Sequence, residues 1–172
     1  MIHIYCGDGK GKTTAGMGLC LRAAGAGKKV LVYQFLKDNT SSERRILEQL
    51  PEIELIRGPE AMKFIFKMSP EERESMRAEY AEVLDGLSRQ LEAGSLVAEV
   101  IFLDEVLYAV SREMVDEAKL LSLLKKGGDR EWILTGRYTG GPLFEVADYI
   151  SEIHKKKHPF DDGIAARKGI EF

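Results

Sequence analysis

The feature that most constrains the fold is a glycine-rich segment directly after the first apolar run of the chain. Residues 6–14 read Cys-Gly-Asp-Gly-Lys-Gly-Lys-Thr-Thr. A β-prone run at 2–6 precedes this segment, and a proline-free apolar stretch at 13–26 follows it and ends among glycines. This order predicts a strand, a tight loop and a helix, which is the context of a phosphate-binding loop. Glycines let the loop backbone point successive N–H groups at an anion, and the helix adds the positive end of its dipole.

The residue types in this loop fit a nucleoside triphosphate. Lys12 supplies a point charge for phosphate oxygens, and the hydroxyl of Thr13 is placed to bind Mg²⁺. The strict loop pattern has glycine where this chain has Cys6, and Gly7 and Gly9 supply backbone freedom in its place. A glycine turn without a ligand is the alternative, which the strand and helix on either side disfavour. The residues predicted to contact the nucleotide here are Gly7, Asp8, Gly9, Lys10, Gly11, Lys12, Thr13 and Thr14.

The rest of the chain alternates strands with helices, which is typical of a parallel sheet covered by helices. The predicted strands are 2–6, 30–35, 53–56, 100–103, 131–134 and 149–153, and the predicted helices are 13–26 and 69–93. We therefore predict an α/β protein with a mostly parallel sheet flanked by helices. Segments 37–42 and 57–68 are predicted loops, and long loops in a compact domain favour a functional lid. The tail at 154–172 has turn signals and no clear periodicity.

Composition narrows the classes of partner. A chain of 172 residues corresponds to one domain, here 1–172. The net charge of -3 gives no general attraction for nucleic acid. There is no export signal, and the apolar runs are far shorter than the roughly 20 residues of a membrane span. The two cysteines, Cys6 and Cys20, indicate a reducing compartment and are most simply small buried hydrophobic residues. We expect a cytoplasmic protein with neither nucleic acid nor membrane as a partner.

Two acidic residues end the most hydrophobic predicted strand. Asp104 and Glu105 follow the run at 100–103, at the carboxyl edge where open α/β sheets bind ligands. Either acid can hold Mg²⁺ directly or through water, and Glu105 can alternatively act as the base for an attacking water. Capping of the next helix is the competing interpretation. The residues thus predict Mg²⁺ held by Thr13 with Asp104 or Glu105 beside a nucleoside triphosphate, and they leave the type of reaction open.

Several segments spread along the chain resemble a single family. They are the loop at 7–14, Gln-Phe-Leu-Lys at 34–37, Ile-Leu-Thr-Gly-Arg at 133–137, Ala-Asp-Tyr-Ile-Ser-Glu-Ile at 147–153 and the C-terminal stretch from Lys157 to Phe172. In order and spacing they resemble the P-loop ATP:corrinoid adenosyltransferases of the CobA/CobO/BtuR type, over nearly the whole chain. The resemblance implies a RecA-like P-loop fold, often assembled as a homodimer. It also implies transfer of the 5′-deoxyadenosyl group of ATP to the cobalt of cob(I)alamin or cob(I)yrinate a,c-diamide, with release of triphosphate, in cobalamin biosynthesis.

The resemblance assigns catalytic roles to three side chains. A Co(I) corrinoid is itself a strong nucleophile, so the protein has to orient ATP and neutralise the departing triphosphate, which suits Lys12. Family members use a Phe-x-Trp pair in a mobile loop to exclude the lower axial ligand of cobalt, which eases reduction of Co(II). Phe64 and Phe66 stand at about this place, with phenylalanine instead of tryptophan. Core packing of these two rings is the alternative.

Further residues have a functional and an ordinary interpretation. Arg22 resembles a nucleotide-contacting arginine of the family, and a surface salt bridge is the alternative. Arg137 is expected either to reach a phosphate or to pair with Asp104. The basic run from His154 to His158 would contact the corrinoid tail or the triphosphate, or simply form a solvated face. The resemblance also implies a flavoprotein reductant as a partner.

Two departures from the family and two other functions complete the sequence interpretation. Lys37-Asp38 replaces the Lys-Gly of the family, and the N-terminal helix of many relatives has no counterpart before the first strand. We therefore expect the corrinoid to be covered by other segments. One alternative function is a P-loop hydrolase or kinase in which Glu105 activates a water or hydroxyl. The other is a non-enzymatic, nucleotide-dependent switch or corrinoid carrier.

Overall fold

The computed structural model describes residues 1–171, and its strands form one six-stranded sheet with the order β3-β2-β4-β5-β1-β6. All neighbouring strands pair in parallel. The strands are β1 (Ile2–Cys6), β2 (Val30–Gln34), β3 (Ile53–Leu55), β4 (Val100–Asp104), β5 (Glu131–Thr135) and β6 (Tyr149–Glu152). Each predicted strand is confirmed, with ends that differ by no more than one residue. The α/β fold with a parallel sheet is confirmed with them.

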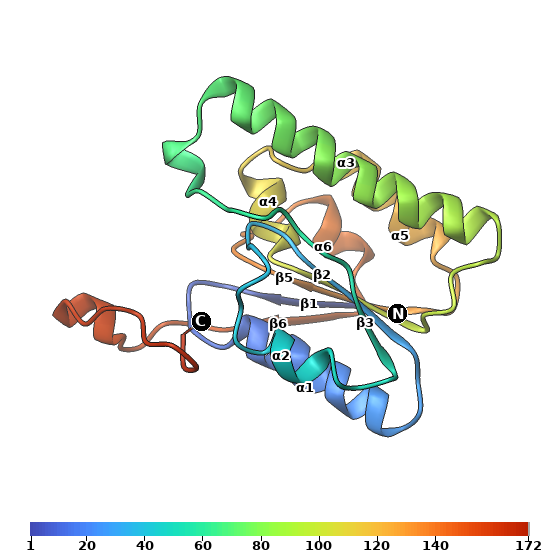
Figure 1. Ribbon diagram of the computed structural model, residues 1–172, viewed down its shortest axis with the longest axis horizontal. Helices are drawn as coiled ribbons and strands as arrows, with labels where there is room; N and C mark the ends of the chain where they lie inside the picture. Colours follow the sequence, from blue (N-terminus) through green and yellow to red (C-terminus); the bar gives the residue numbers. More distant parts are fainter. Residues whose placement is uncertain (172) are drawn as a thin grey trace.

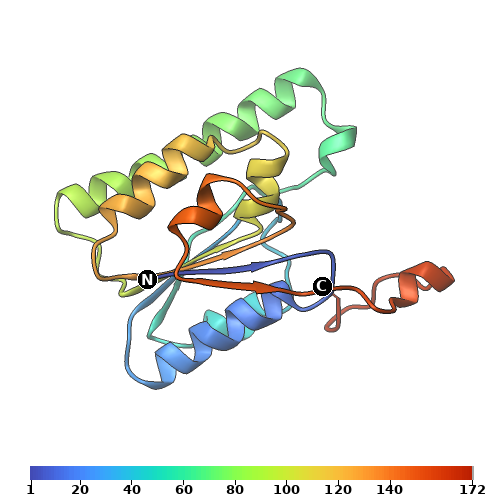
Figure 2. The same ribbon diagram turned by 180° about the vertical axis from the view of Figure 1, so that it is seen from behind.

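Helices cover both faces of this sheet (Figure 1, and from behind Figure 2). One face carries α1 (Lys12–Gly25) and the short α2 (Arg44–Leu47). The other carries α3 (Pro70–Glu92), α4 (Val106–Ser111), α5 (Glu117–Lys126) and α6 (Pro142–Val146). Two 3₁₀ turns, η1 (Ile65–Lys67) and η2 (Pro159–Asp162), lie in the connecting segments. The helices predicted at 13–26 and 69–93 are confirmed as α1 and α3, whereas the sequence analysis missed α2, α4, α5 and α6.

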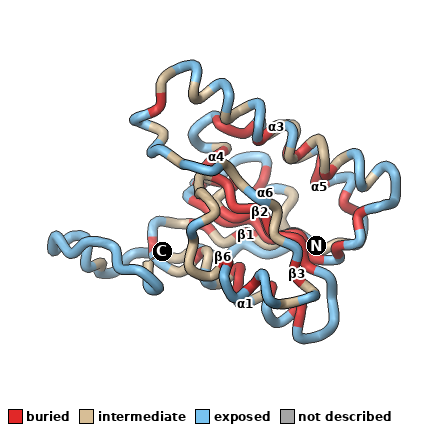
Figure 3. The backbone as a smooth tube through the Cα atoms, viewed as in Figure 1, coloured by how far each residue is buried: buried red, intermediate tan, exposed pale blue. Residues whose placement is uncertain are grey.

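The core has two layers because side chains alternate along each strand. In β4, Phe102 faces Met17 and Cys20 of α1, whereas Ile101 and Leu103 face the layer of α3 and α5. Figure 3 shows this buried material concentrated in the sheet and on the inward sides of the helices. The start of α3 is fixed by a capping box in which Ser69 accepts from the backbone N–H of Glu72.

Two central strands end in residues with a left-handed backbone. Leu36, just after β2, has a φ of 56°, and Glu105, just after β4, has a φ of 59°. Such values are uncommon outside glycine and cost free energy that the surrounding structure must offset. The backbone N–H of Leu36 donates to the hydroxyl of the fully buried Tyr80 at 2.8 Å, and that of Glu105 donates to Thr135 Oγ1 at 2.9 Å. Both turns lie at the carboxyl edge of the sheet, so they aim side chains toward one place.

The tail leaves the end of β6 as an arm that carries η2 away from the sheet (Figures 1 and 2). It then returns, so that residues 169–171 line the same cavity as the start of α1. Phe172, the last residue of the C-terminal signature, lies outside the described residues. Within residues 1–171 no helix has both the length and the apolar character that a membrane crossing requires.

Candidate functional site

The glycine-rich loop packs directly on the end of the edge strand β6. Gly7 has a φ of 100°, and a Cβ there would lie 2.4 Å from the carbonyl oxygen of Ile153. Gly9 donates its backbone N–H to the same oxygen at 2.8 Å, and a Cβ on it would lie 2.8 Å away. Both positions therefore require glycine. Cys6 is the buried last residue of β1, where its small side chain fits.

Lys12 lies across this loop. Its ammonium donates to the carbonyl oxygen of Gly9 at 2.7 Å, and the residue is only 9% exposed. Burial lowers the pKa of Lys12; the charge of Glu105 opposes this, and that of Arg137 adds to it. The lysine side chain is thus held against the loop. An anion placed there would favour the charged form of this lysine.

Thr13 and Asp104 meet although 91 residues separate them in sequence. The hydroxyl of Thr13 donates to Asp104 Oδ1 at 2.8 Å, and Thr135 donates to the same oxygen at 2.7 Å. Asp104 has no exposed surface. The juxtaposition expected from the phosphate loop and the acidic strand end is therefore present.

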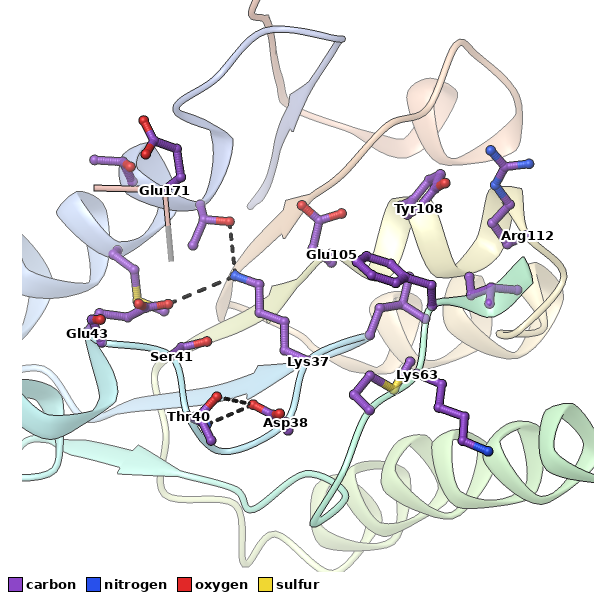
Figure 4. Close-up of a pocket in the computed structure, with 18 of the residues that line it drawn as sticks. Lys37, Asp38, Thr40, Ser41, Glu43, Lys63, Glu105, Tyr108, Arg112 and Glu171 are labelled. Carbon is purple, nitrogen blue, oxygen red and sulfur yellow. Dashed lines mark hydrogen bonds and ion pairs between the residues drawn. The ribbon is translucent and has the colours of Figure 1, made fainter. Parts of the chain in front are cut away.

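Lys37 is the charged partner of Asp104. Its Nζ lies 2.7 Å from Asp104 Oδ2, 3.5 Å from Thr13 Oγ1 and 3.9 Å from Glu43 Oε1. Burial alone would lower the pKa of Lys37, but the attraction and hydrogen bond of Asp104 outweigh it, so the pKa lies above its ordinary value. Figure 4 shows this lysine reaching across the cavity toward Glu43, with Glu105 close by. The expected pairing of Arg137 with Asp104 is wrong, because Lys37 fills that role.

Glu105 points into the same cavity as Lys37 (Figure 4). It directly precedes α4 at the N-cap position, but its side chain makes no capping hydrogen bond, so the interpretation in which this side chain caps the helix is wrong. Burial and the neighbouring charge of Asp104 raise the pKa of the Glu105 carboxyl, while Lys37, Lys12 and Arg137 oppose the rise. The Glu105 carboxyl group, which does not cap α4, therefore lines the cavity that Thr13 and Lys37 also line.

A cleft of about 1270 Å³ extends from the loop to the segment that precedes α3. Thr13 and Thr14 of α1, Glu105, and the aromatic residues Phe64 and Phe66 all line it. The two phenyl rings stack on each other with centroids 5.5 Å apart and are 69% and 75% exposed. The alternative in which these rings pack in the core is therefore wrong. Phe64 directly precedes η1 and Phe66 is its middle residue. The guanidinium of Arg73 connects this turn to α3 by donating to the carbonyl oxygen of Ile65 at 3.0 Å.

Some residues singled out in the sequence lie outside this cleft. Arg22 is exposed in the last turn of α1, ten residues and thus about 15 Å along the helix from Lys12. The structure does not bring it to the loop, and no ion pair within residues 1–171 involves it. Arg137 and Asp8 line a second cavity of about 490 Å³ beside the loop, together with Phe160 of the arm. Lys10 is exposed, and its charge adds to that of Arg167 in lowering the pKa of the Glu171 carboxyl to about 2.

The remaining polar candidates have ordinary partners. His154 pairs with Glu152 at 3.3 Å, and His158 accepts a hydrogen bond from the backbone of Phe160. In the part of the chain that the structure describes, no group of three His, Cys, Asp or Glu side chains could hold a metal ion. Cys6 and Cys20 are buried free thiols, as expected, and burial raises the pKa of Cys20 to about 12.

The sequence analysis missed four polar side chains around Asp104. Lys37 and Gln34 belong to a quoted segment of the resemblance and Thr135 to another, but none was given a role. Gln34 donates to Glu43 at 2.9 Å and to Asp104 Oδ2 at 3.3 Å. Glu43 is the fourth of these side chains, and no signal in the sequence marked it. For the other three the available signal was position alone, since each stands at or just beyond the carboxyl end of a predicted strand.

The first strand of this parallel sheet leads through a glycine-rich loop into a helix. The first threonine of that helix donates a hydrogen bond to a buried carboxylate. These features define the class of P-loop NTPase-like domains. The whole chain, residues 1–172, matches the family described as ATP:corrinoid adenosyltransferase BtuR/CobO/CobP. The chain belongs to this family and is a transferase.

Curated relatives agree with the family. The chain is 34% identical over 173 residues to the corrinoid adenosyltransferase of Escherichia coli (strain K12), which covers 100% of this chain and 85% of the relative. It is 32% identical, with the same coverage, to the corrinoid adenosyltransferase CobA of Salmonella typhimurium (strain LT2). The corrinoid adenosyltransferase of Pseudomonas aeruginosa is 31% identical over 174 residues, with coverages of 100% and 83%. None of these names favours the hydrolase, kinase or carrier alternatives.

Proposed function

We propose that this protein binds ATP at the glycine-rich loop and transfers its 5′-deoxyadenosyl group to the cobalt of a reduced corrinoid held in the adjoining cleft, with triphosphate as the leaving group. One observation supports this assignment: residues at the start of α1 and the exposed pair Phe64 and Phe66 line the same cleft. The type of reaction is inferred from family membership, and we assign it to one domain that spans residues 1–172.

The loop residues act on the leaving group. The backbone N–H groups after Gly7 and Gly9, together with the start of α1, hold the triphosphate oxygens. Lys12 neutralises charge on the triphosphate as it departs. Because the Co(I) corrinoid is the nucleophile, the chain needs no activated serine, cysteine or histidine, and its main task is to orient the ribose 5′ carbon toward cobalt.

Mg²⁺ is part of this proposal. The oxygen donors around the loop, the Thr13 hydroxyl and the Glu105 carboxylate, are of the type that Mg²⁺ prefers, and Asp104 positions the Thr13 hydroxyl through its hydrogen bond. When bound, the ion would reduce the negative charge on the triphosphate leaving group. Asp104 is a further candidate ligand, and it can bind the ion directly only after one of the protein donors to its carboxylate has left.

Phe64 and Phe66 act on the corrinoid. Their stacked, exposed rings offer a flat apolar surface to the cleft. Such a surface can cover the lower face of a corrin ring and exclude its axial ligand, which makes Co(II) easier to reduce. The bond from Arg73 to Ile65 and the ion pair between Lys63 and Glu72 hold the segment against the start of α3.

We further propose a cytoplasmic homodimer that receives its electron from a flavoprotein reductant. The two buried free cysteines fit a reducing compartment. The exposed edge strand β6 leaves one side of the sheet open to a second copy.

Product analysis tests the proposed reaction. The full chain is incubated anaerobically with ATP, Mg²⁺ and a chemically reduced corrinoid. We expect intact triphosphate and a light-sensitive cobalt–carbon adduct in equal amounts. ADP and phosphate with an unalkylated corrinoid would establish the hydrolase, and binding of both ligands without any product would establish the carrier.

A further inference from the structure

The carboxylate of Asp104 has no free position for a cation. An ionised carboxylate offers about four lone-pair sites on its two oxygens. Here Thr13 and Thr135 donate to Oδ1, and Lys37 and Gln34 donate to Oδ2. Four donors therefore fill the four sites, and any ion that binds Asp104 directly must displace one of them.

Lys37 is the donor whose place a metal ion would take. It is the only charged one of the four donors, and its ammonium lies within 4 Å of Asp104, Thr13 and Glu43. These oxygens are a hydroxyl and two carboxylates, which are ligands that Mg²⁺ also accepts. An ammonium is a compact point charge on a flexible stem, so it can occupy such a place and also leave it.

The local backbone holds the lysine in this place. The φ of 56° at Leu36 turns the chain at the end of β2, and the hydroxyl of the buried Tyr80 accepts the N–H of Leu36. Strain of this kind persists only where surrounding contacts determine it, and it concentrates at functional sites. The strained backbone is tolerated here because it helps to place a cation beside Asp104. Asp104 is fully buried, and an unpaired buried carboxylate is strongly destabilising.

We propose that Lys37 is a resident cation that occupies the Mg²⁺ position on Asp104 and keeps divalent ions out of the loop until a triphosphate arrives. The triphosphate then offers the ammonium new anionic oxygens, and the place on Asp104 becomes free. Metal and nucleotide consequently bind together, and the nucleotide-free protein does not hold the metal. This inference rests on the proposed binding of Mg²⁺ and ATP at the loop.

Metal binding without nucleotide tests the proposal. Mn²⁺ is titrated into the full chain, and the loss of the free-ion signal in electron paramagnetic resonance reports binding, with Mg²⁺ as competitor. Removal of a unit charge about 4 Å from a divalent ion changes the affinity for that ion by roughly 30-fold even in water-like surroundings. We therefore expect Lys37→Met to bind Mn²⁺ about 10-fold or more tightly than the unsubstituted protein.

Three further variants make the result specific. Lys37→Arg keeps the cation and should bind no better than the unsubstituted protein. Lys28→Met removes a lysine that is paired with Glu99 at 3.1 Å at the opposite edge of the sheet, so it matches the charge change and should show no gain. Adding Asp104→Asn to Lys37→Met should abolish the gain.

The proposal is overturned if Lys37→Met binds Mn²⁺ no more tightly than the unsubstituted protein does. Thermal melting covers a folding defect, because Mg²⁺ alone should raise the melting temperature of Lys37→Met, or of the milder Lys37→Gln, and leave that of the unsubstituted protein unchanged. If neither variant is stabilised by Mg²⁺, the proposal is wrong. No assay in this set contains ATP or a corrinoid, so its failure is separate from failure of the adenosyl transfer.

Discussion

Replacement of Phe66 by alanine separates the proposed role of this ring from a structural one. The ring is 75% exposed, so three-quarters of it is available to cover a corrin face. Full burial of a phenylalanine is worth about 1.5–3 kcal/mol, so the available contact is worth roughly 1.1–2.3 kcal/mol. That free energy corresponds to a factor of about 6 to 50 in rate. We expect Phe66→Ala to lose this factor when turnover starts from Co(II).

The two cobalt oxidation states give the decisive comparison. If the ring excludes the lower axial ligand, it helps to make Co(I), and it matters little once Co(I) is supplied chemically. Turnover from Co(I) at saturating corrinoid should therefore stay within about 3-fold of the unsubstituted enzyme. The assay follows adduct formation anaerobically from both starting states with the same preparation.

Two alanine variants serve as controls for this comparison. Phe160 is also 75% exposed but lies on the arm, so Phe160→Ala should leave the ratio of the two rates unchanged. Phe102 is fully buried, and its truncation should cost about 3–5 kcal/mol of stability. Phe66→Ala should cost only about 1 kcal/mol, or about 2–4 °C in melting temperature. Equal losses in the two rates, or melting as low as that of Phe102→Ala, would refute the lower-face role.

Three other predictions follow from the loop, the first helix and the cysteines. Lys12→Ala should weaken ATP binding in calorimetry and slow turnover about 10²-fold or more, and unchanged values would exclude this loop as the triphosphate site. Gly18→Ala should raise the free energy of unfolding by about 0.5–1 kcal/mol, because the added methyl group has open space around it. Gly16→Ala should lower the free energy of unfolding, because its methyl group would lie 2.5 Å from the Phe102 ring. Denaturant titration checks both. Because burial raises the pKa of Cys20 to about 12, its thiol in the folded protein should stay protonated and unreactive toward a thiol reagent at pH 8. The stability that the thiol contributes should be lost only as the pH rises from about 9 toward 12. Rapid labelling without denaturant would contradict this.

The loop and its acidic partner could be predicted from the sequence because each depends on local order. A glycine-rich stretch between a strand and a helix fixes the loop, and parallel strands bring their carboxyl ends to one edge, which places Asp104 near Thr13. Lys37 escaped prediction because its direction depends on the left-handed backbone of Leu36, for which no glycine marks the sequence. The exposure of Phe64 and Phe66 was equally hidden, since an apolar pair in a loop fits a core as well as a surface.

The missed helices differ in how much signal they carry. α2, α4 and α6 contain four to six residues, too few for an apolar period to be recognised. α5 had both a cap and a period: Asp116 accepts from the N–H of Lys119, and Leu120, Leu123 and Leu124 form its buried face. Arg22 shows the opposite case, because the predicted helix at 13–26 already places it about 15 Å from Lys12, although its residue type matches the family.

The position of β1 in the sheet has a consequence for the order of folding during synthesis. β1 is made before the other strands of this sheet, yet it pairs only with β5 and β6, whose partner residues follow about 130 and about 146 positions later. The glycine loop in turn packs on Ile153, just after β6. A nascent chain shorter than this therefore has no partner for its first strand and no support beneath its loop. Nucleotide binding by growing or truncated chains should thus begin only when the chain passes residue 153, so that the ability to bind ATP marks completion of the sheet.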